Sequence, residues 1–262
     1  MNCDSKTMRL YAVTDRAWTG RQTLYEQVED ALRGGATCVQ LREKTLGREA
    51  FLREAVEIGA LCRRYGVPFL INDDVGIALE SGADGVHVGQ EDLAAREARR
   101  LLGPDKIVGI SAHTVEEAVK AERDGADYLG VGAVFHTDTK TDVSAMPLDT
   151  LRAIRAAVRI PIVAIGGISL ANVERLAGSG VDGIAVVSAL FAAENVREAA
   201  ERLRAASERM VAMPARSDES FCGAFFKKRP SLYRVLIPRP FTPVPQKRFS
   251  SGESGAPLFA AL

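Results

Sequence analysis

Eight short apolar segments, separated by longer segments with helical periodicity, dominate the first 212 residues of the chain. The predicted strands are Leu10–Thr14, Cys38–Arg42, Pro68–Asn72, Gly85–Val88, Ile107–Ser111, Tyr128–Gly132, Ile162–Ile165 and Gly183–Val187. Between them apolar residues recur at helical spacing, as at Leu24, Val28 and Leu32. Continuous apolar strands joined by helices are typical of a parallel sheet that is covered on both faces.

Glycine-containing turns recur where the predicted helices end and the next strands begin. Gly82–Gly85, Gly125–Tyr128 and Gly180–Gly183 share this pattern, and Gly34–Thr37 is a looser copy. Glycine relieves the left-handed strain that follows a helix, so the chain can turn directly into the sheet. Eight strand–helix units, the last with a predicted helix over 191–210, favour a (β/α)8 TIM barrel over residues 1–212. A doubly wound open α/β sheet is the alternative.

The composition changes after the predicted barrel. Residues 214–262 hold seven of the 11 prolines, six of the ten phenylalanines, and eight basic against three acidic residues. The net charge of zero for the 262-residue chain therefore averages an acidic body and a basic extension. Prolines at this density interrupt helices and central strands, so we predict a disordered extension over 213–262.

Several classes of protein are disfavoured by the sequence. A neutral chain argues against a nucleic-acid or membrane-surface binder, and no apolar run approaches the roughly 20 residues of a membrane helix. Residues 1–9 lack the apolar core of a secretory signal, so we expect a cytoplasmic protein. The four cysteines, Cys3, Cys38, Cys62 and Cys222, share no CxxC spacing and are interpreted as unreactive thiols. The oligomeric state stays open, with a homo-oligomer as one alternative.

Polar residues collect where the predicted strands end, which is the catalytic face of such barrels. Alternation along the second strand places Gln40, Arg42 and Lys44 on one side, where two cations suit an anionic group. Ion pairs with neighbouring carboxylates are the alternative use of these cations. Asp73 and Asp92 follow the next two strands and offer oxygen ligands for Mg²⁺. The alternative is that Asp73, Asp74 and Asp92 cap the helices that follow.

Later strand ends complete this predicted face. Ser111 and His113 follow the fifth strand, and His113 is either a polar group at the mouth or the start of a helix. The sixth strand leads into a hydroxyl-rich loop with Lys140, which can close over an anion. Gly166–Gly167 and Ser188 follow the last two strands, where such barrels bind phosphate through backbone N–H groups. The sequence therefore predicts two anion sites, one for a magnesium-bound pyrophosphate and one for a monophosphate.

Taken in order, these motifs resemble the thiamine phosphate synthase (thiamine-phosphate pyrophosphorylase) family. The matching segments, within residues 8–210, are Tyr11–Asp15, Gln40–Lys44, Asn72–Asp74, His87–Asp92, Thr137–Lys140, Ala164–Ile168 and Val187–Ser188. The resemblance implies transfer of a hydroxymethylpyrimidine unit from its diphosphate to hydroxyethylthiazole phosphate, which gives thiamine phosphate and pyrophosphate. It also implies a dissociative, Mg²⁺-assisted mechanism, in which pyrophosphate leaves before the thiazole nitrogen attacks.

The resemblance also assigns roles by position. It implies that the pyrimidine diphosphate is held by Gln40, Arg42, Lys44, Asn72, Ser111 and Lys140, and Mg²⁺ by Asp73 and Asp92. The thiazole phosphate is assigned to Thr137, Thr139, Gly167, Val187 and Ser188. We extend the expected substrate contacts to Leu41, Glu43 and Asp138, and expect catalysis from Arg42, Lys44, Ser111 and Lys140. The expected partners are phosphorylated small molecules, and neither nucleic acid nor membrane.

Two rival functions stay open from the sequence. A thiazole tautomerase-like isomerase on the same barrel would need a general acid/base such as His113, and no Mg²⁺. A non-catalytic phosphate-binding barrel would lack cations or carboxylates at the first anion site. The presence of Asp73, Asp92 and Thr137–Lys140 favours the synthase.

Overall fold

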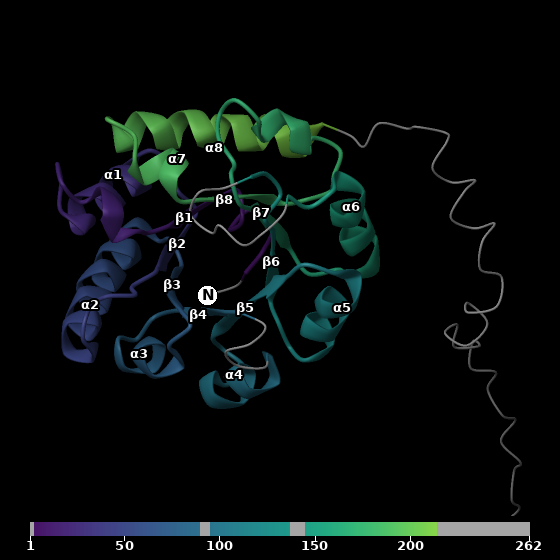
Figure 1. Cartoon of the computed structure of the whole chain (residues 1–262). Helices are drawn as coiled ribbons and strands as arrows, with labels where there is room; N and C mark the ends of the chain where they lie inside the picture. The colour runs from purple at the N-terminus through teal and green to yellow at the C-terminus, as the bar shows by residue number, and fades with distance from the viewer. Residues whose placement is uncertain (1–2, 90–94, 137–144, 214–262) are drawn as a thin grey trace, which may run out of the picture. The chain divides into compact units, whose positions relative to one another are not determined.

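The computed structural model describes residues 3–89, 95–136 and 145–213, and eight parallel strands within them form a closed barrel. The ring closes because β1 pairs with both β2 and β8 (Figure 1). The strands are β1 (Leu10–Val13), β2 (Cys38–Leu41), β3 (Phe69–Asn72), β4 (Gly85–Val88), β5 (Ile107–Ala112), β6 (Tyr128–Gly132), β7 (Ile162–Ile165) and β8 (Gly183–Val186). The predicted TIM barrel is confirmed, and the predicted strand ends lie within one residue of those observed.

Helices surround the barrel in Figure 1. They are η1 (Arg16–Trp18), α1 (Leu24–Arg33), α2 (Arg48–Tyr65), α3 (Val75–Glu80), α4 (Ala95–Leu102), α5 (Val115–Arg123), α6 (Leu148–Ala157), η2 (Val173–Leu176), α7 (Ser188–Phe191) and α8 (Val196–Ala212). The prediction of a helix over 191–210 is wrong about where that helix begins. Phe191 ends α7, and α8 begins after Asn195, whose Oδ1 accepts the Glu198 N–H at 3.0 Å and caps the new helix. None of the described helices is long and apolar enough to cross a bilayer.

Alternation along the strands creates two separate apolar layers. Outward-facing residues such as Leu41 and Ile71 pack against the helices, whereas inward-facing residues such as Leu70 and Val163 fill the barrel. Two tyrosines, Tyr11 and Tyr128, belong to the inner layer and are at most 1% exposed. The interior is therefore packed rather than hollow, and its polar atoms come from a few large side chains.

The three repeated turns each form a hydrogen bond with the strand that precedes them. Gly82, Gly125 and Gly180 have positive φ angles, as the sequence pattern predicts. Two residues later in each turn, an aspartate accepts a hydrogen bond from the backbone N–H at or near the start of the preceding strand; the pairs are Asp84–Phe69 (2.9 Å), Asp127–Val108 (2.7 Å) and Asp182–Ile162 (2.9 Å). The repeat thus stabilises the face of the barrel opposite the predicted catalytic face.

The structure describes three of the four cysteines, of which Cys3 is partly buried. Cys38 and Cys62 are buried, reduced thiols, and burial raises the pKa of Cys62 to about 12, which makes its thiolate scarce. Cys222 lies outside the described residues, as does the predicted extension except for Met213.

Candidate functional site

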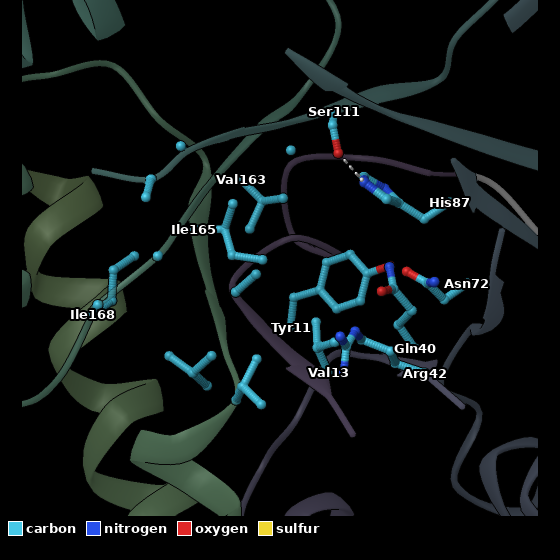
Figure 2. Close-up of a pocket in the computed structure, with 18 of the residues that line it drawn as sticks. Tyr11, Val13, Gln40, Arg42, Asn72, His87, Ser111, Val163, Ile165 and Ile168 are labelled. Carbon is cyan, nitrogen blue, oxygen red and sulfur yellow. Dashed lines mark hydrogen bonds between the residues drawn. The ribbon is translucent and has the colours of Figure 1, made fainter. Parts of the chain in front are cut away.

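A pocket of about 170 Å³ lies where the strands end, at the face that the sequence predicts to be catalytic. Its lining includes seven of the predicted site residues, namely Gln40, Arg42, Asn72, Ser111, Gly167, Val187 and Ser188. Figure 2 shows the side chains from β1, β2 and β3 on one side of the pocket and those from β7 on the other. Residues that are far apart in the sequence thus meet around one space.

One cation, Arg42, lines the first side of the pocket, and a second, Lys44, lies outside the lining; each is paired with a carboxylate. Arg42 Nη1 lies 3.1 Å from Asp15 Oδ2, and Lys44 Nζ lies 2.7 Å from Asp73 Oδ2. Arg42 lines the pocket, whereas Lys44 follows the end of β2 and has a side chain that is 53% exposed. The strand alternation that places Gln40 and Arg42 on one side therefore does not extend to Lys44. The positive charge of each cation is therefore balanced by a carboxylate in the absence of a ligand.

Two of the expected substrate contacts, Leu41 at the end of β2 and Glu43 after it, do not line the pocket. Leu41 is fully buried in the layer between the barrel and the helices. Glu43 accepts hydrogen bonds from Arg16 Nε at 2.8 Å and from the N–H groups of Lys44, Thr45 and Leu46 at 2.6–3.0 Å. Burial alone would raise the pKa of Glu43, but the hydrogen bonds from Thr45 and Arg16 outweigh it and lower the pKa to about 2. Glu43 therefore shapes the loop as an anion at neutral pH.

Asp73 and Asp74 have different roles although they are adjacent. Asp74 Oδ1 accepts the Ile77 N–H at 2.8 Å and caps α3, so the capping alternative holds for this residue. Asp73 has a φ of 64°, a left-handed conformation that is uncommon outside glycine. Its Oδ2 accepts hydrogen bonds from Asn72 Nδ2 at 2.5 Å and from Lys44 at 2.7 Å. Such backbone strain occurs at functional sites, and here it turns a carboxylate toward the cationic side.

The opposite side of the pocket combines glycine backbone with apolar side chains such as Ile165 and Ile168. Gly166 and Gly167 have φ angles of 99° and 63°, and a Cβ on Gly167 would lie 2.1 Å from the His136 carbonyl oxygen. Asn172 Nδ2 donates to the Gly167 carbonyl at 2.8 Å, and Asn172 Oδ1 accepts the Ser169 N–H at 2.8 Å. Asn172 is a residue that the sequence interpretation missed; it holds the loop after β7 in place.

The remaining predicted residues divide into two groups. His113 lines the pocket, and its Nδ1 lies 3.3 Å from Glu117 Oε2, while Thr114 caps α5. Asp92, Thr137, Asp138, Thr139 and Lys140 lie outside the described residues.

A chain of hydrogen bonds that the sequence interpretation missed crosses the floor of the pocket. Gln40 Nε2 donates to Tyr11 Oη at 2.9 Å, and the hydroxyls of Tyr11 and Tyr128 are 2.7 Å apart. Tyr128 Oη lies 2.8 Å from His87 Nδ1, and His87 Nε2 lies 3.1 Å from Ser111 Oγ. Figure 2 shows the Gln40 and Tyr11 end and the His87 and Ser111 end of this chain. We call these five residues the relay.

The relay could have been noticed in the sequence by its polar atoms. Tyr11, His87 and Tyr128 occupy inward positions of otherwise apolar strands, where an apolar residue would suffice for packing. Burial raises the pKa values of Tyr11 and Tyr128 well above 10, so both phenols keep their protons at neutral pH. The floor of the pocket is therefore polar but uncharged at both tyrosines, in contrast to the cationic side.

Comparisons with known proteins agree on one family. A family model described as thiamine monophosphate synthase matches residues 10–190. Thiamine-phosphate synthases of Clostridium acetobutylicum and Chloroflexus aurantiacus are 46% and 53% identical to the chain over 190 and 192 residues. These matches cover 72% and 73% of the chain, and 90% and 88% of the relatives. The structure of a thiamine phosphate pyrophosphorylase from Pyrococcus furiosus aligns with a TM-score of 0.72 and 40% identity, over 79% of the chain and 98% of that protein.

Proposed function

The chain belongs to the thiamine monophosphate synthase family, and from this premise we propose how its pocket carries out the synthesis of thiamine phosphate. The activity makes the chain a transferase of thiamine biosynthesis. Hydroxymethylpyrimidine diphosphate and hydroxyethylthiazole phosphate are the two substrates, and pyrophosphate is the second product. The observation that carries this assignment is a pocket with a cationic side, a polar floor and a glycine-containing side.

The two sides of the pocket suit the two substrates. The diphosphate would lie beside Arg42, Lys44 and Asn72, where the Arg42 fork can bind phosphate oxygens through the nitrogens that do not contact Asp15. The pyrimidine ring would extend over the floor, near Gln40 and Ser111. The thiazole phosphate would lie against Gly167, Val187 and Ser188, where the lack of a side chain on Gly167 lets backbone N–H groups approach it.

Asp73 is the described residue that fits a magnesium ligand. Its carboxylate does not cap α3, is 29% exposed and stands beside the cations that would bind the diphosphate. Within the described ranges no cluster of three metal-ligating side chains occurs, which is compatible with Mg²⁺ because this ion keeps waters and binds substrate oxygens. Asp92, outside the described residues, would be the second ligand. When bound, Mg²⁺ would offset the negative charge that develops on the departing pyrophosphate.

The protein's own groups then stabilise a dissociative displacement. The bond between the pyrimidine methylene carbon and the diphosphate oxygen breaks, and its electron pair leaves with pyrophosphate. Arg42 in the pocket lining stabilises that charge most, because a preorganised cation acts most strongly where it is shielded from water, and the more exposed Lys44 adds to it. The thiazole nitrogen then donates its lone pair to the methylene carbon and forms the new C–N bond. No step requires a strong base, in keeping with the uncharged phenols of the pocket floor.

The direct test is to incubate the purified protein with both substrates and Mg²⁺, and to detect thiamine phosphate by chromatography with mass detection. Controls omit one substrate at a time. Formation of thiamine phosphate and pyrophosphate in equal amounts is expected only in the complete mixture. Absence of thiamine phosphate from that mixture would refute the assignment.

A further inference from the structure

The relay joins residues from five different strands into one continuous path across the barrel. In order, they are Gln40 on β2, Tyr11 on β1, Tyr128 on β6, His87 on β4 and Ser111 on β5. Gln40 is 4% exposed, and Tyr11 and Tyr128 are more deeply buried still. Hydroxyl groups at such depth require hydrogen-bond partners, because burial without them is strongly unfavourable.

Two glycines make space for the relay. A Cβ on Gly109 would lie 2.1 Å from Tyr128 Cζ, and a Cβ on Gly130 would lie 2.9 Å from His87 Cε1. Neither position tolerates a side chain while the phenol and the imidazole keep their places. The barrel is therefore constructed around these two rings, which argues against an incidental contact between polar groups.

The direction of the hydrogen bonds follows from counting protons. Gln40 Nε2 donates to Tyr11, so the single Tyr11 proton is directed to Tyr128, and the Tyr128 proton in turn to His87 Nδ1. An Nδ1 that accepts leaves the ring proton on Nε2, which donates to Ser111.

Hydrogen bonds that ran in the opposite direction would leave the Tyr11 hydroxyl with a poor acceptor. If Tyr128 donated to Tyr11, then Tyr11 would accept two hydrogen bonds, and its own proton would have the Cys38 sulfur as its acceptor. A thiol sulfur is a weak acceptor. The arrangement in which each hydroxyl accepts one bond and donates one bond is the more stable of the two.

We propose that Tyr128, supported by Tyr11, is a positioning residue that holds His87 as the Nε2–H tautomer and thereby orients the Ser111 hydroxyl for the pyrimidine. Ser111 Oγ accepts the His87 Nε2–H, so the Ser111 proton points away from the imidazole. This orientation is the one in which the hydroxyl can donate to a nitrogen of the pyrimidine ring. This inference rests on the proposed function for the identity of the ligand, but the tautomer of His87 is a property of the protein alone. The arrangement of hydrogen-bond donors and acceptors on the floor of the pocket would then be fixed before substrate binds.

The tautomer can be measured directly in the ligand-free, full-length protein by ¹⁵N NMR of the imidazole nitrogens. The chain has three histidines, so His113→Gln and His136→Gln variants assign the signals. We expect the Nε2–H tautomer for His87 in the unmodified protein and in Tyr11→Phe, which keeps the Tyr128 hydroxyl next to Nδ1. Tyr128→Phe removes that donor and should give a mixture in which the Nδ1–H form is clearly detected. An Nδ1–H or doubly protonated His87 in the unmodified protein, or no change in Tyr128→Phe, would overturn the proposal.

Kinetics separate positioning from a general structural role. Tyr128→Phe should raise KM for the pyrimidine diphosphate about tenfold, the loss expected from one misdirected hydrogen bond, and change KM for the thiazole phosphate less than about twofold. Equal effects on both substrates would contradict the inference, and urea unfolding checks that the variant is folded. If the protein made no thiamine phosphate, the proposed function would fail, while the NMR measurement would still decide the tautomer.

Discussion

Asp15 contacts Arg42 with one carboxylate oxygen and the start of η1 with the other. Its Oδ2 lies 3.1 Å from Arg42 Nη1, and its Oδ1 accepts the Ala17 N–H at 2.9 Å. The aspartate thus fixes the guanidinium relative to the loop that follows β1, and it partly balances the guanidinium charge in the absence of substrate.

The Asp15–Arg42 ion pair predicts that substitutions of its two residues lower the activity by different amounts. Arg42→Ala should lower kcat/KM by about 100-fold or more, because a preorganised cation is lost from the departing pyrophosphate. Asp15→Asn keeps a side-chain oxygen for the Ala17 N–H and should cost about tenfold through a less constrained Arg42. Steady-state assays of both variants give the comparison. A wild-type rate in Arg42→Ala would mean that the diphosphate binds elsewhere.

Asp73 offers a test that separates activity from stability. Asp73→Ala and Asp73→Gly both remove the carboxylate, so both should lower turnover severely. Glycine favours the φ of 64°, whereas alanine does not, so Asp73→Gly should be more stable than Asp73→Ala by about 1 kcal/mol. Urea unfolding and activity assays together check this. If either variant turned over at the wild-type rate, Asp73 would not be part of the machinery.

Metal dependence follows from the proposed role of Asp73. We expect EDTA to abolish thiamine phosphate formation and added Mg²⁺ to restore it. Isothermal titration of Mg²⁺ in the presence of pyrophosphate should show binding to the unmodified protein and much weaker binding to Asp73→Asn, which keeps the shape but not the charge. Full activity in EDTA would refute the Mg²⁺ proposal, although not the family assignment.

The sequence predicted the barrel well because its strands are short, apolar and punctuated by glycine. It predicted Gln40, Arg42, Ser111 and Gly167 because polar or flexible residues at strand ends have few structural uses. The relay lies inside the strands rather than at their ends, so this argument missed it, and only the polar atoms of Tyr11, His87 and Tyr128 at inward positions pointed to it. The position of Lys44 also needed coordinates, because strand alternation stops where β2 ends.

Glu43 gives a prediction for the effect of pH on stability. Its pKa is lowered to about 2 in the folded protein, from an ordinary value of 4.5. A depressed pKa stabilises the fold above the ordinary value, and this contribution is lost as the pH falls through the folded value. Glu43→Gln should therefore be destabilised at pH 7 by about 1–3 kcal/mol, and the difference from wild type should shrink between pH 4.5 and 2.

Urea unfolding at several pH values measures this difference. Glu49→Gln is a matched control, because the Glu49 side chain is 95% exposed and should show little change at any pH. A Glu43→Gln difference that stays constant down to pH 2 would contradict the lowered pKa.

The last helix defines where the chain can be shortened. Met210 is 1% exposed, and the Ser207 hydroxyl donates to the Arg9 carbonyl at 2.5 Å, so α8 closes the barrel against β1 nearly to its end. A chain of residues 1–213 keeps both contacts and should retain its melting temperature and its rate within about twofold. A chain of residues 1–205 loses both and should be destabilised by about 3–5 kcal/mol, since removal of one buried methionine side chain alone costs about 2–5 kcal/mol. Thermal unfolding and activity of the two truncations test this, and a large loss in the 1–213 chain would show that residues 214–262 contribute to the barrel or to its chemistry.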